Sequence, residues 1–199
     1  EVIQKTLPWL KDRFGNPSAV CPNGQEAHEA IESARKNVAD LINADPEEIY
    51  FTSGGTEADN WILQSSCPWG HPAHIITSAI EHHAVLNTAK ALEQRGVRVS
   101  YIQPDKNGQI HPEQIEKHIR RDTRLISIMF ANNEIGTIEP IEEIAKIAHK
   151  NGIIFHTDAV QAIGNCFIDV QKMNIDMLSL SGHKIHAPKG IGALYVKNG

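Results

Sequence analysis

A short apolar segment followed by an amphipathic helical pattern recurs along the chain. Most of the apolar segments are continuous runs, which is typical of strands that are covered on both faces. We expect strands at residues 49–53, 74–78, 97–102, 125–131, 153–158, 176–180 and 192–197. We expect helices at residues 25–42, 57–64, 82–94, 112–120 and 141–150.

The pattern at residues 141–150 shows the helical spacing clearly. Its apolar residues fall on one stripe, formed by Ile141, Ile144, Ala145, Ile147 and Ala148, whereas the acidic and basic residues between them would face water. Pro140 suits the first turn of a helix, and the pair Asn151-Gly152 is a typical stop. Alternation of strands with such helices predicts an α/β domain with a largely parallel sheet.

The composition is that of a soluble globular domain. The chain has 199 residues, of which 41% are hydrophobic and 22% are charged, and its formal net charge is −5. It has no dense run of Lys and Arg, so nucleic acid is a poor partner. It also lacks a membrane-length apolar stretch and a signal-peptide pattern at residues 1–10. Three widely spaced cysteines indicate neither a disulfide framework nor a zinc site, so we expect a reducing cytoplasm.

Ligands of parallel α/β sheets gather at the carboxyl ends of the strands, so polar residues at those positions are candidates for chemistry. The first strand runs into Gly54-Gly55-Thr56-Glu57, where a helix pattern begins. Glycines let the backbone approach a ligand, and the N–H groups of the helix start, with the Thr56 hydroxyl, could bind an anion. A plain strand–turn–helix junction capped by Thr56 explains the same residues.

Asp158 ends another apolar segment, with Gln161 three residues later. A buried acid needs a positive partner, which could be a protonated pyridine nitrogen, an arginine, a lysine or a metal. A helix cap is the alternative. Near the end of the chain, Ser181-Gly182-His183-Lys184 lies between two strand patterns. A lysine held there could act as a Schiff-base nucleophile and proton carrier, or could be an ordinary solvated loop residue.

Two further strand ends carry polar side chains. His82 and His83 open a helix pattern after the strand at 74–78, and Asn133 follows the strand at 125–131. Each could be structural, as a cap or a turn residue. Together, the five strand ends would supply a phosphate site, an aromatic-ring site and an amine, which an aldehyde cofactor with a phosphate tail needs.

Five segments resemble the signature blocks of cysteine desulfurases, which are fold-type-I, class V pyridoxal-phosphate enzymes that convert cysteine to alanine and a persulfide. These segments are FTSGGTEADN (51–60), EHHAV (81–85), ANNEIGTIEPI (131–141), HTDAVQAIG (156–164) and SGHKIHAPKGIGALYV (181–196). They occur in family order over essentially the whole chain. The resemblance implies a three-layer α/β/α sandwich around a mainly parallel, seven-stranded sheet.

The resemblance also implies roles for individual residues. Lys184 would hold pyridoxal 5'-phosphate and then move protons on the substrate, and Asp158 would pair with the ring nitrogen. His82 would stack on the ring face. Gln161 would donate a hydrogen bond to the ring oxygen, and Asn133 would meet that oxygen or the substrate carboxylate.

The phosphate tail would be held by four residues of the glycine turn and of the lysine segment. These are Gly55, Thr56, Ser181 and His183. No metal ligand is implied.

The family pattern is incomplete in residues 1–199, which match its cofactor-binding large domain. The first strand, the small domain and the catalytic cysteine of the family have no counterpart here, and Cys21, Cys67 and Cys166 are interpreted as structural. We therefore expect the chain alone to be inactive. The resemblance implies L-cysteine as substrate, a homodimer, and a sulfur acceptor or scaffold protein in iron–sulfur cluster or thio-cofactor assembly.

Other functions fit parts of the sequence. A class V aminotransferase or a selenocysteine lyase would share Lys184 and Asp158. A metal hydrolase built on His71, His74, His82, His83 and Asp158 lacks a recognisable ligand spacing. A non-catalytic truncated domain is a further alternative, although Lys184, Asp158 and His82 are all intact.

Overall fold

The computed structural model describes residues 1–68 and 70–198. Its α-helices are α1 (Val2–Lys11), α2 (Pro22–Ile42), α3 (Gly55–Ser65), α4 (His83–Glu93), α5 (Pro112–His118) and α6 (Ile141–Lys150). Its strands are β1 (Ile49–Thr52), β2 (His74–Ser78), β3 (Arg98–Ile102), β4 (Thr123–Ser127), β5 (Ile154–Asp158), β6 (Met177–Ser181) and β7 (Gly192–Val196). Two 3-10 helices, η1 (Pro46–Glu48) and η2 (Gly182–Ile185), complete the order.

The strands form one sheet in the order β1-β7-β6-β5-β4-β2-β3. Neighbouring strands are parallel except at β7, which runs antiparallel to both β1 and β6. Because β1 and β6 are both antiparallel to β7, their carboxyl ends lie at the same edge as those of β2, β4 and β5. The expected α/β fold with a mainly parallel, seven-stranded sheet is confirmed.

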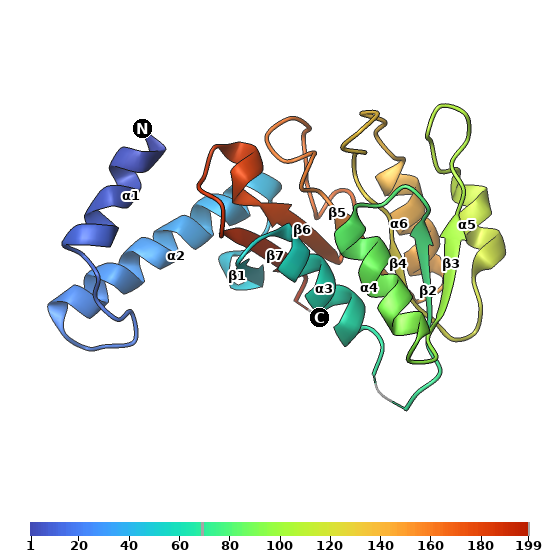
Figure 1. Cartoon of the computed structure of the whole chain (residues 1–199), viewed down its shortest axis with the longest axis horizontal. Helices are drawn as coiled ribbons and strands as arrows, with labels where there is room; N and C mark the ends of the chain where they lie inside the picture. Colours follow the sequence, from blue (N-terminus) through green and yellow to red (C-terminus); the bar gives the residue numbers. More distant parts are fainter. Residues whose placement is uncertain (69, 199) are drawn as a thin grey trace.

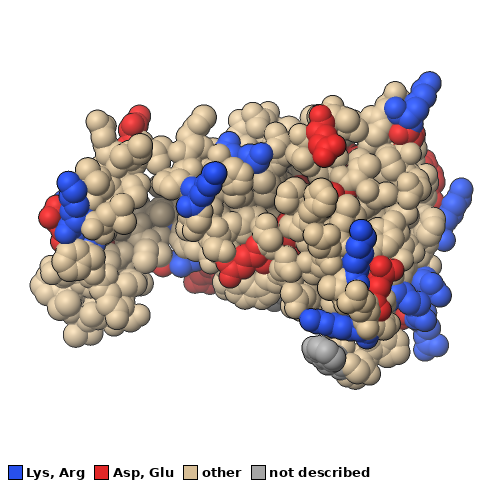
Figure 2. All heavy atoms as spheres, viewed as in Figure 1, with Lys and Arg blue, Asp and Glu red and all other residues tan. Residues whose placement is uncertain are grey.

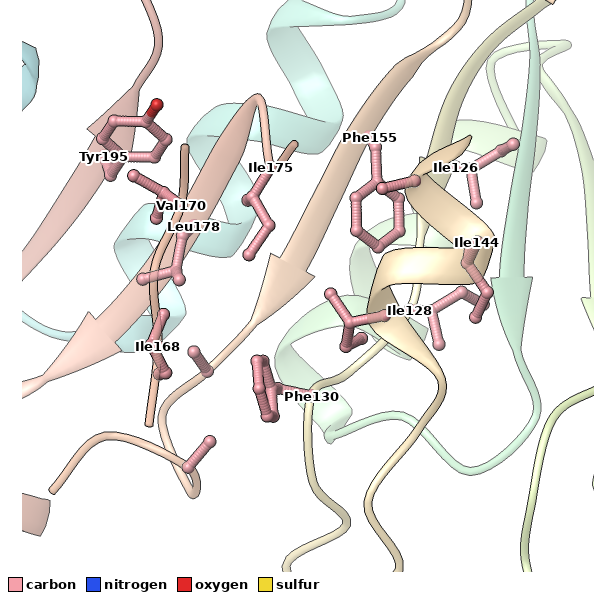
Figure 3. Close-up of a cluster of buried hydrophobic side chains, with 14 of the residues drawn as sticks. Ile126, Ile128, Phe130, Ile144, Phe155, Ile168, Val170, Ile175, Leu178 and Tyr195 are labelled. Atoms are coloured by element: carbon pink, nitrogen blue, oxygen red, sulfur yellow. The ribbon is translucent and has the colours of Figure 1, made fainter. Parts of the chain in front are cut away.

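Helices cover both faces of the sheet, which gives three layers (Figure 1). On one face, α3 and α4 pack on the strands through a cluster that includes Ile62, Val85 and Leu92. On the other face, α2, α5 and α6 contribute to a larger cluster around Phe155, and Figure 3 shows Ile144 of α6 beside it. Strands covered in this way are buried along their length, as all five residues of β2 are.

Several expected boundaries differ from the structure, most of them by one to three residues. The strand expected at 125–131 ends as a regular element at Ser127, although Ile128 and Phe130 still donate to β5 carbonyls. The N–H of Met129, between them, donates to the side-chain carboxyl of Glu81 and not to a β2 carbonyl. This bond ends the ladder on the β2 side. The expected helix at 112–120 ends at His118. Helix α1 was not expected, although Ile3, Leu7 and Leu10 fall at helical spacing, and none of its residues is buried in the described part of the chain.

The surface carries charges of both signs. On the face shown in Figure 2, Lys and Arg are scattered and lie among Asp and Glu. Within the described residues, no helix combines the length and the apolar character that crossing a bilayer requires.

Candidate active site

A cavity of about 330 Å³ opens at the carboxyl edge of the sheet, between β1, β5 and β6. The turns after β2 and β4 also contribute to its lining. All nine residues that the sequence singled out lie around it: Gly55, Thr56, His82, Asn133, Asp158, Gln161, Ser181, His183 and Lys184. The chain therefore brings together, in one place, the polar groups of five strand ends.

One wall of the cavity is the glycine turn that leads into α3. The first N–H groups of this helix have no carbonyl partner within it, so they are free to meet an anion. A Cβ on Gly55 would lie 2.6 Å from Val160 Cγ2, and a Cβ on Gly192 would lie 2.7 Å from Gly54 Cα. Glycines at these positions let the turn lie directly against β7 and the segment after β5.

A hydroxyl and an imidazole face this turn from η2 and the end of β6. Ser181 Oγ lies 2.8 Å from His183 Nδ1, so the two side chains form a hydrogen-bonded unit. When His183 Nδ1 accepts this bond, its Nε2–H is free to donate to a ligand. Helix N–H groups, a hydroxyl and an imidazole donor form a set that fits a phosphate group.

Asp158 lies at the end of β5 with 5% of its surface exposed. Its Oδ1 accepts the N–H of Val160 at 2.9 Å, which fixes the carboxyl in place. Burial raises the pKa of Asp158, while the Val160 N–H and electrostatic interactions with His82 and Lys184 act in the opposite direction. A cationic ring nitrogen in the cavity would fit this carboxyl.

His82 is the N-cap of α4, and its ring lines the cavity. Its Nδ1 accepts the N–H of Ala84 at 3.1 Å, so the neutral ring carries its proton on Nε2. Lys184 is exposed in η2 and lines the cavity from another side. An aromatic aldehyde with a phosphate tail therefore finds an amine, an acid, a flat ring and an anion site around one cavity.

Sequence reasoning missed Glu81, whose side chain forms hydrogen bonds next to the cavity-lining His82 and Met129. Glu81 is buried, and its Oε1 accepts hydrogen bonds from Ser78 Oγ at 2.6 Å and from Met129 N at 2.9 Å. Burial raises the pKa of Glu81 more than the hydrogen bonds lower it, so the pKa is about 8. The only signal in the sequence was its place directly before His82.

A second missed residue is Asp59, which lines the cavity from α3 with 1% of its surface exposed. Its Oδ1 lies 3.7 Å from Nε2 of His156, a buried residue of β5. The sequence contained a signal for Asp59. Because Asp59 is three residues before Ile62, helical spacing places both on the face of α3 that packs against the sheet.

The metal-hydrolase alternative finds no support in the geometry. In the part of the chain that the structure describes, no three His, Cys, Asp or Glu side chains form a metal-binding group. His74 starts β2, whereas the cavity lies beyond the opposite, carboxyl end of that strand. Its ring nitrogens contact Thr123 Oγ1 at 2.8 Å and Ser100 Oγ at 2.9 Å, so it belongs to the hydrogen bonding of the sheet.

The sheet order and the cavity define an α/β protein whose ligand site lies at the carboxyl edge of a mainly parallel sheet. The chain belongs to the class-V aminotransferase family, since the sequence profile described as Aminotransferase class-V matches residues 1–199.

Curated relatives agree with the resemblance to cysteine desulfurases and confirm it. The chain is 55% identical over 201 residues to the cysteine desulfurase IscS of Methanosarcina thermophila. That match covers 100% of this chain and 50% of the relative. It is 48% identical over 201 residues to the mitosomal cysteine desulfurase of Trachipleistophora hominis, covering 98% of this chain and 46% of the relative. The chain thus spans about half the length of the curated relatives it matches.

Solved structures agree as well. A structure titled NIFS-like protein superposes with a TM-score of 0.96 at 40% identity, over 100% of this chain and 55% of that one. A structure titled SspA in complex with cysteine superposes with a TM-score of 0.94 at 46% identity, over 98% of this chain and 57% of that one.

Proposed function

We propose that this chain forms the cofactor-binding large domain of a pyridoxal-phosphate-dependent cysteine desulfurase. The observation that carries the proposal is the convergence of nine residues, among them Lys184 and Asp158, on one cavity at the carboxyl edge of the sheet. The relatives named cysteine desulfurase and the neighbour whose title includes cysteine favour L-cysteine as the substrate. They favour this reaction over those of an aminotransferase or a selenocysteine lyase.

Bound pyridoxal phosphate supplies an aldehyde that combines with amino groups and an electron-poor ring that accepts an electron pair. Lys184 would hold the aldehyde through its amine, and the free amine would take and return the proton at the substrate Cα. Asp158 would pair with the ring nitrogen and keep it protonated. His82 would cover one ring face, and Gln161 would donate to the ring oxygen.

The remaining residues position the two ends of the ligands. The N–H groups at Gly55 and Thr56, with Ser181 and His183, hold the phosphate. Asn133 offers its carboxamide to the substrate carboxylate or the ring oxygen. Because these residues come from three separate strand ends, together they would fix the ring between Lys184 and Asp158.

The second half of the reaction needs a thiolate that takes the sulfur as a persulfide and leaves alanine. Among the described residues, no cysteine lines the cavity. Burial raises the pKa of Cys67 to about 11, which disfavours its thiolate, and Cys21 lies in the loop before α2. The sulfur-accepting thiol therefore comes from outside residues 1–199. A homodimer in the cytoplasm that passes sulfur to an acceptor protein for iron–sulfur cluster assembly completes the proposal.

The test is an assay of the whole protein with L-cysteine, in which alanine and sulfide are measured in parallel with dithiothreitol present. We expect equal amounts of alanine and sulfide, and neither product from Lys184→Ala. Lys189→Ala, five residues along the same segment, serves as the control and should retain activity. 3-Mercaptopyruvate formed with an amino-group acceptor, without alanine or sulfide, would instead indicate an aminotransferase.

A further inference from the structure

Two carboxyl groups are buried around the same cavity. Asp59 of α3 is 1% exposed and Asp158 of β5 is 5% exposed, and both line the space where a ligand would lie. Two carboxylates that share a desolvated site repel each other, so one of them retains a proton. The chemistry of the site depends on which of the two ionises.

The charges around these two carboxyl groups differ in sign. Asp158 accepts the Val160 N–H at 2.9 Å and lies near His82 and the positively charged Lys184, whose electrostatic interactions lower its pKa. Burial raises the pKa of Asp59 well above the usual value, and the negative charge of the nearby Asp158 acts in the same direction. A contact with the Ser179 side chain opposes this effect only in part.

His156 does not supply the missing positive charge. Its ring is fully buried, with Nδ1 2.9 Å from Ser127 Oγ and Nε2 3.0 Å from Ser179 Oγ. Burial lowers the pKa of His156 to about 3, so the ring is neutral at physiological pH. Its Nε2 is 3.7 Å from Asp59 Oδ1, which is too long for a hydrogen bond.

Asp59 Oδ1 has no hydrogen-bond partner within residues 1–68 and 70–198. A carboxylate in that position would leave a charge buried and unpaired, whereas a carboxylic acid leaves a neutral polar group, which costs less to bury. The geometry of the cavity therefore separates the two acids into a proton holder and an anion.

We propose that Asp59 is a positioning residue that carries the proton of this pair, so that Asp158 is the one carboxylate of the two presented to the cavity. This inference rests on the proposed function in one respect: the Asp158 carboxylate is taken to pair with the ring nitrogen of pyridoxal phosphate. A neutral Asp59 keeps the Asp158 carboxylate stable inside the protein. It also keeps the negative charge next to the nitrogen rather than shared between two acids.

The proton is measured directly by infrared difference spectroscopy of the whole protein at pH 7, after removal of the cofactor. The spectrum of wild type minus Asp59→Asn should contain the C=O stretch of a protonated carboxyl. The control is Asp169→Asn, which removes an acid that accepts the Lys172 N–H at 2.9 Å and should show the bands of a carboxylate. Carboxylate bands in the Asp59 difference spectrum would overturn the proposal.

Asp158→Asn provides a second arm, because it removes the anion nearest to Asp59. The proton of Asp59 should then be lost at a lower pH than in wild type. If Asp59→Asn does not fold, wild-type protein labelled with 13C in aspartate carboxyls gives the answer. A protonated aspartyl band should persist at pH 7, and its absence contradicts the proposal.

Binding of pyridoxal phosphate supplies an independent readout. Asp59→Asn should change the Kd by less than about threefold, since it replaces one neutral polar group with another. Asp158→Asn should raise the Kd by about tenfold or more, because a hydrogen bond to a charged group is lost. Equal losses in both variants would mean that Asp59 is also an anion. If no variant and no wild type binds the cofactor, the proposed function fails, while the infrared spectra still locate the proton.

Discussion

The Glu81 carboxyl group accepts the backbone N–H of Met129 at 2.9 Å and thereby joins two loops of the candidate active site. Glu81 directly precedes His82, and Met129 leads to Asn133. Asn132 adds a second link between the same loops, since its Nδ2 donates to the carbonyl of Ile80 at 2.9 Å. The spacing between His82 and Asn133 is therefore set by side chains that do not themselves need to touch a ligand.

A pH dependence of stability follows from Glu81. Burial raises its pKa to about 8, so the folded protein binds a proton that the unfolded chain loses near pH 4.5. The contribution of Glu81 to the free energy of unfolding should therefore fall as the pH rises from about 4.5 to about 8. Glu81→Gln cannot ionise and should flatten this part of the profile. Urea unfolding of the whole protein at a series of pH values measures the effect.

Glu143→Gln on the exposed side of α6 is the matched control and should leave the profile unchanged. Glu139 contributes a slope of the same sign, because burial raises its pKa to about 7. For this reason the Glu81→Gln profile should flatten without becoming level. An unchanged slope in Glu81→Gln would show that this carboxyl does not hold its proton in the folded state.

Lys184 is the expected attachment point of the cofactor. Borohydride reduction of the whole protein with pyridoxal phosphate, followed by peptide mapping, should place the pyridoxyl group on the peptide that contains Lys184. Lys184→Ala should leave no reduced adduct, whereas Lys189→Ala should be labelled like wild type. Label on Lys189 in the wild-type protein would contradict the assignment.

Asp158→Asn should slow turnover of L-cysteine when the cofactor is saturating. A hydrogen bond to a charged group contributes about 1.5–3 kcal/mol, so the loss corresponds to roughly tenfold to a hundredfold in rate. Alanine formation measured at saturating cofactor separates this effect from weaker binding. Full turnover by Asp158→Asn would remove the ring nitrogen as the partner of Asp158.

The three cysteines of this chain should be dispensable for sulfur transfer. A whole protein with Cys21→Ser, Cys67→Ala and Cys166→Ala should release sulfide within about twofold of the wild-type rate, because none of these thiols lines the cavity. Residues 1–199 expressed alone should release no sulfide. Sustained turnover by the isolated chain, lost in its triple cysteine variant, would identify one of these cysteines as the nucleophile.

The periodicity of the sequence predicted the sheet well because buried strands and helical stripes leave simple patterns. The continuous apolar run of β2 and the stripe of α6 are examples. The end of β4 could not be predicted in the same way. Residues 128–131 remain as apolar as the strand before them, and only the long-range bond from Met129 to Glu81 shows where the regular ladder stops.

The residues of the candidate site were also predicted only in part. Residues such as Lys184 and Asp158 stand at strand ends, where polar groups after apolar runs attract notice. Asp59 lies within the amphipathic helix α3, and His156 lies within the apolar strand β5, so neither stands at a strand end. The 3.7 Å approach of these two residues joins elements far apart in sequence, so local patterns contain no trace of it.

The pairing of β1 with β7 has a consequence for how the protein is made. The N–H of Asn198 donates to Glu48 Oε1 at 2.8 Å across 150 residues of sequence, and Ile49 pairs with Tyr195. On a ribosome, β1 and the glycine turn emerge early but must wait for β7 before they gain a place in the sheet. Closing so long a loop is slow compared with local folding. The glycine-turn wall of the cavity is thus completed last during synthesis.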